Sequence, residues 1–355
     1  MKICYTGGGT LGHVVPALAV NQKLHKNQCI SAIWIGSKNA TIQALVEKEG
    51  ISYRAVPSGK LRRYFSLKNG SDVFLIIIAF VSSFFILKKF KPDVLFSKGG
   101  YVSVPAVFAA SFLHIPIITH ESDYNMGLAN RLNCRKANVV ATGFQMKETT
   151  IKRASVVFTG NPVREEFETE NGEYPLPFPP RGKPTLLVLG GSQGAEEINS
   201  LVYETLDDLL AFTNVIHQCG KGKKRGVQKE GYFETELFTQ NMAGVYHAAT
   251  LVVCRCGAGT LSEISATAKP ALLIPLRFAS RGEQEANALY FENKGAAVVL
   301  KEKYTREDFV KTVLALLSDK AKLSSLSENL QQMKSGNSSQ RIADLIIKLA
   351  KVKEK

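Results

Sequence analysis

Short apolar runs alternate with glycine-rich turns and longer, partly polar segments along the first half of the chain. Residues 2–6 predict a strand, residues 7–12 a glycine turn, and residues 16–26 a helix with a proline near its first turn. The same pattern predicts a helix at 41–49 and strands at 31–35, 93–97, 115–120, 139–142 and 156–159. Strands that alternate with helices in this way indicate a parallel sheet covered by helices.

The pattern breaks once and then repeats. Residues 168–184 contain five of the thirteen prolines and show no apolar periodicity, which is typical of a linker. The segments that follow predict strands, a glycine turn at 190–194 and a helix, with the strands at 185–189, 214–217, 251–254 and 271–274. We therefore expect an α/β protein with two Rossmann-like domains whose parallel sheets face each other across a ligand-binding cleft.

The domain boundaries follow from this break. Residues 1–165 are expected to form the first domain, residues 166–184 the linker and residues 185–340 the second domain. The final predicted helix, 341–352, either closes the second domain or returns to the first.

The longest apolar run, residues 73–87, lies between Asp72 and the pair Lys88-Lys89. Its fifteen residues would extend less far than the roughly 30 Å of a bilayer core, so we do not expect it to span a membrane. Two alternatives remain: a buried helix packed on the sheet, or a helix whose surface partly touches lipid beside the flanking cations.

Composition is that of a folded globular protein, but the charge is unevenly distributed. Hydrophobic residues make up 45% and charged residues 21%, which argues against a disordered chain and against a polytopic membrane protein. Of the net charge of +14, residues 1–165 carry +13, from 21 Lys+Arg against 8 Asp+Glu. A basic first half on a nearly neutral second half indicates that the first half faces an anionic partner.

Cysteine usage and the N-terminus predict a reduced, cytosolic chain. The six cysteines form no CxxC motif, and they and the six histidines show no zinc-site spacing. The chain reaches a glycine turn at residue 7, which leaves no room for the apolar region of a signal peptide.

Three glycine loops follow predicted strands. The first, Gly7 to Gly12, satisfies G-x-G-x-x-G, but residues 36–38 after the next strand offer no acid for a ribose, which disfavours a dinucleotide. The loop at 190–194 lacks the Lys-Ser/Thr pair of a nucleotide-triphosphate loop. Each is either an anion site at a helix start or a tight turn without a ligand. The third, 97–105, allows a ligand close to its backbone, and Tyr101 adds a hydroxyl.

The most distinctive segment runs from Cys254 to Glu263. Its glycines expose the first N–H groups of a predicted helix to a phosphate, and Glu263 can accept hydrogen bonds from both hydroxyls of a ribose. The alternative is a carboxylate that only complements the helix dipole. Gln284 and Asn287, three residues apart on a helix, suit two amides that reach a sugar; alternatively they are simply solvated.

These motifs together resemble one glycosyltransferase family. The family's motifs occur here in the same order, at residues 8–16, 99–101, 160–164, 190–194, 254–263 and 284–287. The resemblance covers nearly the whole chain and is to the MurG family, UDP-N-acetylglucosamine:lipid I transferases with the GT-B fold. It implies an inverting transfer of N-acetylglucosamine from UDP-GlcNAc to the muramyl 4-hydroxyl of lipid I. The product would be lipid II, made for peptidoglycan at the cytoplasmic face of the membrane.

The resemblance also implies roles for single residues. His13 matches a histidine proposed as the base or as a group that orients the acceptor. Thr239 and Met242 match the segment near the uracil, Glu263 the ribose carboxylate, and Arg164 a cleft residue. The other donor-site residues so implied are Thr10, Leu11, Gly12, Ser192, Gln193, Ala258, Gly259, Thr260, Leu261, Gln284 and Asn287. Those implied for the acceptor side are Gly99, Gly100, Tyr101, Glu121 and Asp123.

No cofactor and no metal are expected. The sequence has no Asp-x-Asp motif of metal-dependent sugar transferases, so loop amides and helix N-termini would stabilise the departing UDP.

Two departures from the family pattern lie in the first half. The family's His-Glu-Gln-Asn is His120-Glu121-Ser122-Asp123 here, and Leu11 replaces a glycine. A diverged transferase with another lipid-linked acceptor is therefore one alternative. A UDP-sugar 2-epimerase and a nucleotide-binding regulatory module are two others; no nucleic-acid recognition motif is present.

The basic charge of the first half then acquires a specific interpretation. We expect an apolar, membrane-facing surface flanked by cations, bound peripherally to an anionic leaflet at the cytoplasmic face. These cations are Lys60, Arg62, Arg63, Lys88, Lys89 and Lys91.

Overall fold

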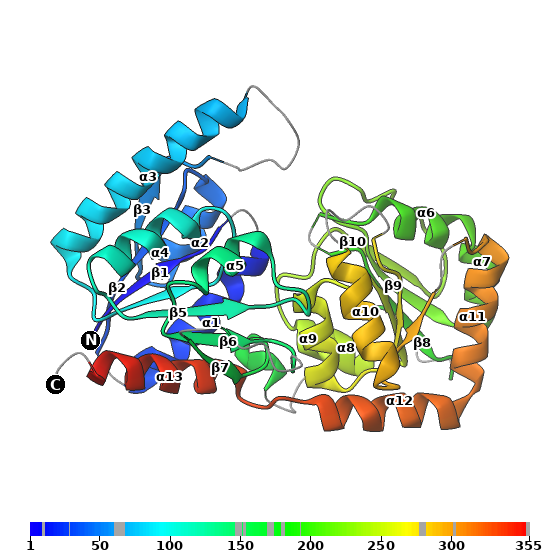
Figure 1. Cartoon of the computed structure of the whole chain (residues 1–355). Helices are drawn as coiled ribbons and strands as arrows, with labels where there is room; N and C mark the ends of the chain where they lie inside the picture. Colours follow the sequence, from blue (N-terminus) through cyan, green and yellow to red (C-terminus); the bar gives the residue numbers. More distant parts are fainter. Residues whose placement is uncertain are drawn as a thin grey trace. The chain divides into compact units, whose positions relative to one another are not determined.

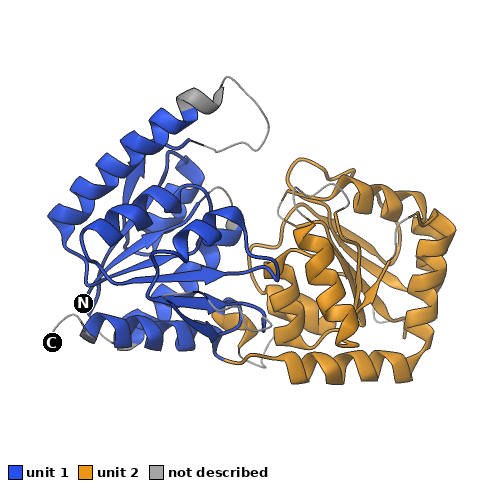
Figure 2. Ribbon diagram, in the orientation of Figure 1, with its two compact units in different colours: residues 1–164, 337–355 blue, residues 165–336 orange. Residues whose placement is uncertain are grey.

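The computed structural model divides the chain into two compact units (Figure 2). Unit 1 comprises Met1–Arg164 and Asn337–Lys355, and unit 2 comprises Glu165–Gly336. The structure describes the chain except for residues 9–10, 28, 60–67, 146–150, 152–153, 169–173, 179–181, 192, 277–281, 301–302 and 353–355.

Unit 1 is built on a seven-stranded parallel sheet in the order β3-β2-β1-β4-β5-β6-β7 (Figure 1). Its strands are β1 Lys2–Thr6, β2 Ser31–Ser37, β3 Ser52–Val56, β4 Val94–Ser97, β5 Ile117–Glu121, β6 Val139–Thr142 and β7 Ser155–Phe158. Its helices are α1 Leu11–Asn27, α2 Ala40–Lys48, α3 Lys68–Phe90, α4 Ser103–Phe112, α5 Leu128–Asn133 and α13 Ser338–Val352.

Both faces of this sheet are buried, because successive strand residues point to opposite sides. Ile3 and Tyr5 of β1 pack with α1, α2 and α13, whereas Cys4 between them packs with α3 and α4. The C-terminal helix α13 lies beside α1, with Ile342, Ile346 and Ala350 buried at a spacing of four residues (Figure 1). The final helix therefore returns to the first half of the chain.

Unit 2 repeats the architecture with a six-stranded parallel sheet in the order β10-β9-β8-β11-β12-β13. Its strands are β8 Thr185–Leu189, β9 Asn214–Gln218, β10 Tyr232–Thr235, β11 Leu251–Cys254, β12 Ala271–Leu273 and β13 Val298–Val299. Its helical segments are η1 Glu165–Phe167, α6 Glu196–Glu204, α7 Leu206–Phe212, α8 Met242–Ala248, α9 Ala258–Thr267, α10 Glu283–Asn293, α11 Arg306–Ser318 and α12 Lys320–Met333. The predicted fold class, two α/β halves with parallel sheets, is confirmed.

Helix α3 has two different faces. Ala79, Ser83 and Leu87 are buried at a spacing of four residues, on the side that packs against α4. Phe74 is 64% exposed and Phe85 62% exposed on the other side. Asp72–Phe90 is long and apolar enough to cross a membrane by length and composition alone, which is weak support for a span because core helices pass the same test. The helix is neither fully buried nor free of the fold.

Candidate functional site

Each sheet has a topological switch point, where the strand order reverses. It lies between β1 and β4 in unit 1 and between β8 and β11 in unit 2. Ligands of open parallel sheets bind outside the carboxyl ends of strands at such points. The loops there are Gly7–Gly8 and Lys98–Gly100 in unit 1, and Gly190–Gly194 and Arg255–Gly257 in unit 2. Most of the motifs singled out in the sequence therefore lie where a ligand site is expected.

The glycine loop after β8 is closely packed against the end of β9. A Cβ on Gly194, whose φ is +69°, would lie 2.0 Å from the carbonyl oxygen of Cys219, and a Cβ on Gly190 would lie 2.5 Å from the amide nitrogen of Ala195. Only glycine fits at such distances. Gln193 in this loop is exposed, whereas Ser192 lies outside the described residues.

Helix α9 presents an open N-terminus after β11. Its N-cap is Gly257, which makes no side-chain capping hydrogen bond. A Cβ on Gly257 or Gly259 would meet no atom within 4 Å, so the space beside these two glycines at the helix start is open. Ala258 and Leu261 anchor the helix in the interior, and Thr260 is partly buried. The arrangement suits an anion such as a diphosphate.

Glu263 lies in the second turn of α9 and is partly buried. Its Oε2 atom accepts a hydrogen bond of 3.0 Å from the hydroxyl of Tyr246, a fully buried residue of α8. A carboxylate held in one orientation by a rigid partner is prepared to accept further hydrogen bonds. The motif does not reveal Tyr246, because it comes from another helix.

The two amides on α10 hold the turn that precedes α9. The Oε1 atom of Gln284 accepts hydrogen bonds from the backbone N–H groups of Cys256, at 3.3 Å, and Leu276, at 3.0 Å. Asn287 is fully buried, and its Nδ2 donates to the carbonyl oxygen of Cys256 at 3.0 Å. Both side chains thus shape the turn, whereas the sequence suggested amides directed at a sugar.

Arg255 fixes the other side of the same turn. Its guanidinium donates to Glu197 Oε2 at 2.7 Å and to the carbonyl oxygens of Ile274 and Pro275, and Tyr304 donates to Glu197 Oε1. A partly buried arginine paired in this way positions backbone rather than binding substrate. The sequence offered no signal for it, because Glu197 of α6 and the carbonyl groups after β12 are distant from Arg255 in the chain.

Thr239 and Met242 differ in their surroundings. Thr239 is exposed before α8, and Met242 is a buried first residue of that helix. Asn241 between them has φ +52° and caps the helix through a hydrogen bond from the Gly244 N–H. A ligand can therefore reach Thr239 from solvent, whereas the Met242 side chain belongs to the core.

In unit 1 the two glycine loops pack against each other. A Cβ on Gly100, whose φ is +81°, would lie 2.5 Å from the carbonyl oxygen of Gly8, and one on Gly99 would lie 2.8 Å from the amide of Asn130. Tyr101 is partly buried against the α3–α4 side of the core. Gly12 is exposed in the first turn of α1; Thr10 and the side chain of Leu11 lie outside the described residues.

His13 is the third residue of α1 and is partly buried. Its Nδ1 atom is buried without a hydrogen-bond partner among the described residues. Burial, reinforced by the nearby charge of Lys98, lowers the pKa of His13 to about 4, while Asp123 acts in the opposite direction. The imidazole is therefore neutral near pH 7 and can accept a proton.

Both carboxylate oxygens of Glu121 accept hydrogen bonds from nearby groups of unit 1. Its Oε2 accepts hydrogen bonds from the Gly127 N–H and the Asn130 amide, and its Oε1 accepts one from the Asp123 N–H. It is 5% exposed, and burial raises its pKa. The carboxyl group thus orders the loop between β5 and α5, which carries the partly buried Asp123.

Arg164, expected in a cleft, is the last residue of the first segment of unit 1 and is partly buried.

Metal or thiol chemistry finds no support among the described residues. They contain no group of three or more His, Cys, Asp or Glu placed to hold a metal ion. All six cysteines are free; burial raises the pKa of Cys256 to about 12 and holds that of Cys254 well above its usual range. The thiols of the most distinctive motif are therefore un-ionised core groups.

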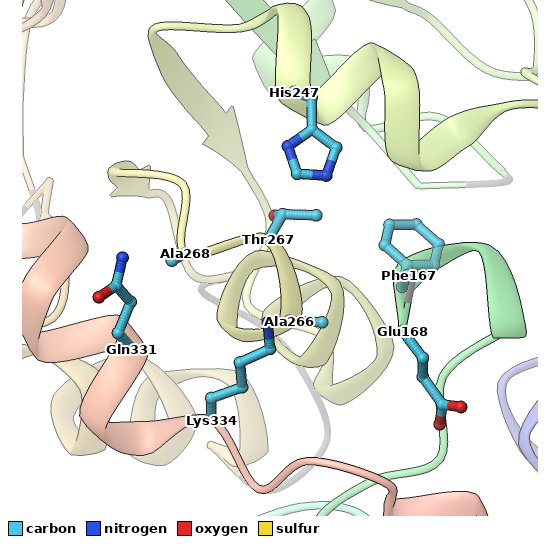
Figure 3. A pocket seen from close by; sticks show the side chains of 8 residues that line it. All are labelled: Phe167, Glu168, His247, Ala266, Thr267, Ala268, Gln331 and Lys334. Carbon is cyan, nitrogen blue, oxygen red and sulfur yellow. The ribbon is translucent and has the colours of Figure 1, made fainter. Parts of the chain in front are cut away.

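A cavity of about 490 Å³ lies in unit 2 at the C-terminal end of α9 (Figure 3). Its lining includes Phe167, His247, Thr267 and Lys334, and none of the residues predicted from the sequence. The α9 residues predicted for the donor, Ala258 to Leu261, lie at the opposite end of that helix, so this cavity is separate from the α9 N-terminus.

Each half of the chain matches a known domain family. Residues 3–142 match the glycosyltransferase family 28 N-terminal domain, and residues 185–346 match the glycosyltransferase family 28 C-terminal domain. The crystal structure of Acinetobacter baumannii MurG superposes with a TM-score of 0.75 and 27% identity, covering 98% of this chain and 99% of that one.

Curated relatives agree. A Clostridium kluyveri protein is 43% identical over 307 residues, 85% of this chain and 86% of its own length. A Clostridium tetani protein is 39% identical over 98% of both chains. Each is named UDP-N-acetylglucosamine--N-acetylmuramyl-(pentapeptide) pyrophosphoryl-undecaprenol N-acetylglucosamine transferase. Together with the family match over both halves, these relatives show that the chain belongs to glycosyltransferase family 28, as a MurG-type transferase.

Proposed function

We propose that this protein transfers N-acetylglucosamine from UDP-GlcNAc to lipid I, the undecaprenyl-pyrophosphoryl muramylpeptide, and so forms lipid II for peptidoglycan. The observation that carries this proposal is the name shared by relatives that match up to 98% of the chain. The switch-point loops support it, because they provide an open anion site in a sheet of the nucleotide-binding type.

Unit 2 is proposed to hold the donor. The diphosphate of UDP would accept hydrogen bonds from the first-turn N–H groups of α9 and from the loop after β8. The ribose hydroxyls would donate to Glu263, which Tyr246 holds in place. Gln284 and Asn287 would act indirectly, by fixing the Cys256–Gly257 turn.

The transfer itself is proposed to be inverting and to need no metal. The acceptor hydroxyl oxygen would bond to the anomeric carbon while the bond from that carbon to UDP breaks. The hydroxyl proton would pass to the neutral imidazole of His13, and the negative charge that develops on the leaving diphosphate would be stabilised by the α9 N-terminus.

A transfer assay tests the proposal. Purified protein is incubated with labelled UDP-GlcNAc and a lipid I analogue, with and without EDTA, and the labelled disaccharide is measured. Product in both arms is the expected result. Transfer only to a different lipid-linked acceptor would show that lipid I is not the substrate. This outcome is tested because Ser122 and Asp123 differ from the family pattern. Loss of product with EDTA would contradict the metal-independent reaction.

We further propose that unit 1 docks on an anionic membrane surface through α3. Phe74, Ile77 and Phe85 are more than half exposed on one side of the helix, and Phe112 of α4, which contacts Phe84, extends the apolar area. Lys88, Lys89 and Lys91 are exposed at its end, with the Lys88 Nζ 5.9 Å from the centre of the Phe84 ring. Lys60, Arg62 and Arg63 lie outside the described residues. Apolar area beside cations is the pattern of peripheral binding.

Neutralising the cations should weaken this binding. Each cation near an anionic surface contributes about 1 kcal/mol, so changing Lys88, Lys89 and Lys91 together to glutamine should lower vesicle affinity roughly 100-fold. Phe85→Ser should also weaken it, whereas Phe212→Ser, on an equally exposed phenylalanine of unit 2, should not. Sedimentation with phosphatidylglycerol vesicles measures both effects. Binding that ignores salt and survives these substitutions would refute the surface.

A further inference from the structure

Lys98 is a buried lysine at the switch point of unit 1. It follows β4, opens the glycine loop that continues with Gly99, and is only 1% exposed. Lysines are almost never fully buried unless they are paired, because removing an ammonium group from water is costly. Its burial beside the candidate acceptor loops therefore requires an explanation.

The partners of Lys98 come from the end of the neighbouring strand β5. Its Nζ lies 2.7 Å from His120 Nδ1 and also donates to the Ser122 hydroxyl. Burial lowers the pKa of Lys98 to about 8, and the carboxylates of Glu121 and Asp123 limit that fall. The group is thus still an ammonium ion near pH 7. Burial and the nearby Lys98 charge hold the pKa of His120 well below its usual range, so its imidazole can accept.

The far side of His120 is also fixed. Its Nε2 lies 3.0 Å from the carbonyl oxygen of Gly160, which accepts the hydrogen of the neutral ring. The Ser122 backbone carbonyl accepts a hydrogen bond of 3.0 Å from the Asn161 amide. Lys98 is therefore the centre of a hydrogen-bonded group that joins the ends of β4 and β5 to the segment after β7.

Lys98 and His13 lie on either side of Gly7. A Cβ on Gly7 would be 3.2 Å from the Lys98 Cβ and 3.7 Å from the His13 Cβ, so both side chains begin within contact distance of the same position. The described charged groups that act on His13 are Lys98, from the loop after β4, and Asp123, from the loop after β5. They have opposite signs, and the same Asp123 also acts on Lys98.

We propose that Lys98, with His120 and Ser122 as its hydrogen-bond partners and Asp123 as a nearby opposite charge, is a positioning residue of the transfer reaction. Its buried ammonium group fixes the residues after β5 and adds to the effect of burial in keeping His13 neutral, the form that accepts the proton of the acceptor hydroxyl. The proposal rests on the proposed function, because it gives His13 the role of base. It also accounts for the departure of Ser122 and Asp123 from the family pattern: the short hydroxyl accepts from Lys98, and the carboxylate balances its charge.

The first test needs no catalysis. The imidazole of His13 is titrated by NMR in the wild-type protein and in Lys98→Met, with His13→Gln used to assign the signal. Removing the charge of Lys98 should raise the midpoint of His13 by about one pH unit. Lys48→Met, on an exposed lysine of α2, is the matched control and should leave the midpoint unchanged. An unchanged midpoint in Lys98→Met would overturn the proposal.

The second test asks whether the three residues act as a unit. Lys98→Met and the pair Ser122→Gln with Asp123→Asn should each lower kcat, by about 10-fold or more. The triple variant should retain more activity than the product of the two losses predicts, because it removes the positive charge of Lys98 together with the negative charge of Asp123. Independent, multiplicative losses would overturn the proposal.

Thermal unfolding of every variant distinguishes a folding defect from a specific loss of activity. If Lys98→Met does not fold, Ser122→Ala, at a partly buried position, replaces it in the kinetic test; no fall in its kcat would overturn the proposal. Failure of the proposed function is distinguishable: a wild-type protein that uses no lipid I refutes that function, while the NMR titration still decides the link between Lys98 and His13.

Discussion

Glu263→Ala should weaken the binding of UDP about 100-fold. A carboxylate that accepts hydrogen bonds from two ribose hydroxyls contributes about 1.5 kcal/mol or more for each, and about 3 kcal/mol corresponds to that factor. Isothermal titration calorimetry with UDP measures the loss. Glu328→Ala, on an exposed glutamate of α12 in the same unit, is the matched control and should bind as the wild type does.

A modified nucleotide shows whether the loss belongs to the ribose. The wild-type protein should prefer UDP to 2′,3′-dideoxyuridine diphosphate, and Glu263→Ala should show no preference. Tyr246→Phe, which removes the hydroxyl that holds Glu263 Oε2 at 3.0 Å, should give an intermediate affinity. A Glu263→Ala protein that still discriminates between the two nucleotides would contradict the assignment of Glu263 to the ribose.

His13→Ala should lower kcat by 10²- to 10⁴-fold, roughly the contribution of a positioned general base. UDP affinity should not change, because the groups proposed to bind the diphosphate and ribose, the α9 N-terminus and Glu263, lie in unit 2 and His13 in unit 1. Steady-state kinetics with the lipid I analogue, beside UDP titrations, separates the two effects. His25→Ala, on an exposed histidine of the same helix, should keep wild-type turnover. Equal turnover in His13→Ala would remove it from the reaction.

The pH dependence of kcat gives a second measure of the same residue. Burial lowers the pKa of His13 to about 4, so the neutral base predominates from pH 7 down to about that value. Turnover should therefore hold between pH 7 and 5 and fall only as the pH approaches 4. A fall centred near 6.5, the ordinary value for histidine, would show that His13 is not buried in the working enzyme.

Regular strands were the most predictable part of this fold. Residues 2–6, 139–142, 185–189 and 251–254 were predicted with the same ends that the structure has, because central parallel strands are continuous apolar runs bounded by turns. The short strand β3 was missed, since its SYRAV sequence carries polar residues at the edge of the sheet, where burial is incomplete. Helix α1 begins at Leu11, before the predicted start at residue 16, because Pro16 is accommodated inside it.

The sequence indicated where the site residues lie better than it indicated what their side chains contact. The glycine loops and the open N-terminus of α9 follow from local residue types, and the structure places them at switch points. The resemblance implies ligand contacts for Asn287 and Glu121, and the structure adds that each is buried and hydrogen-bonded to backbone groups. A polar side chain in a sequence does not reveal whether its partner is a substrate or the chain itself, because that partner is distant in sequence.

The order of strands, turns and helices follows from local periodicity and from glycine's freedom at tight turns, and these suffice to indicate the fold class. The family is indicated by the resemblance of the ordered motifs to those of known transferases. The return of α13 to α1 and the exposure of one face of α3 depend on which surfaces bury each other. The pairing of Lys98 with His120 and Ser122 depends on β4 lying beside β5. Such contacts join segments that are far apart in the chain. They are favoured by the apolar surface that is removed from water when the core forms, and local sequence does not show which surfaces those are.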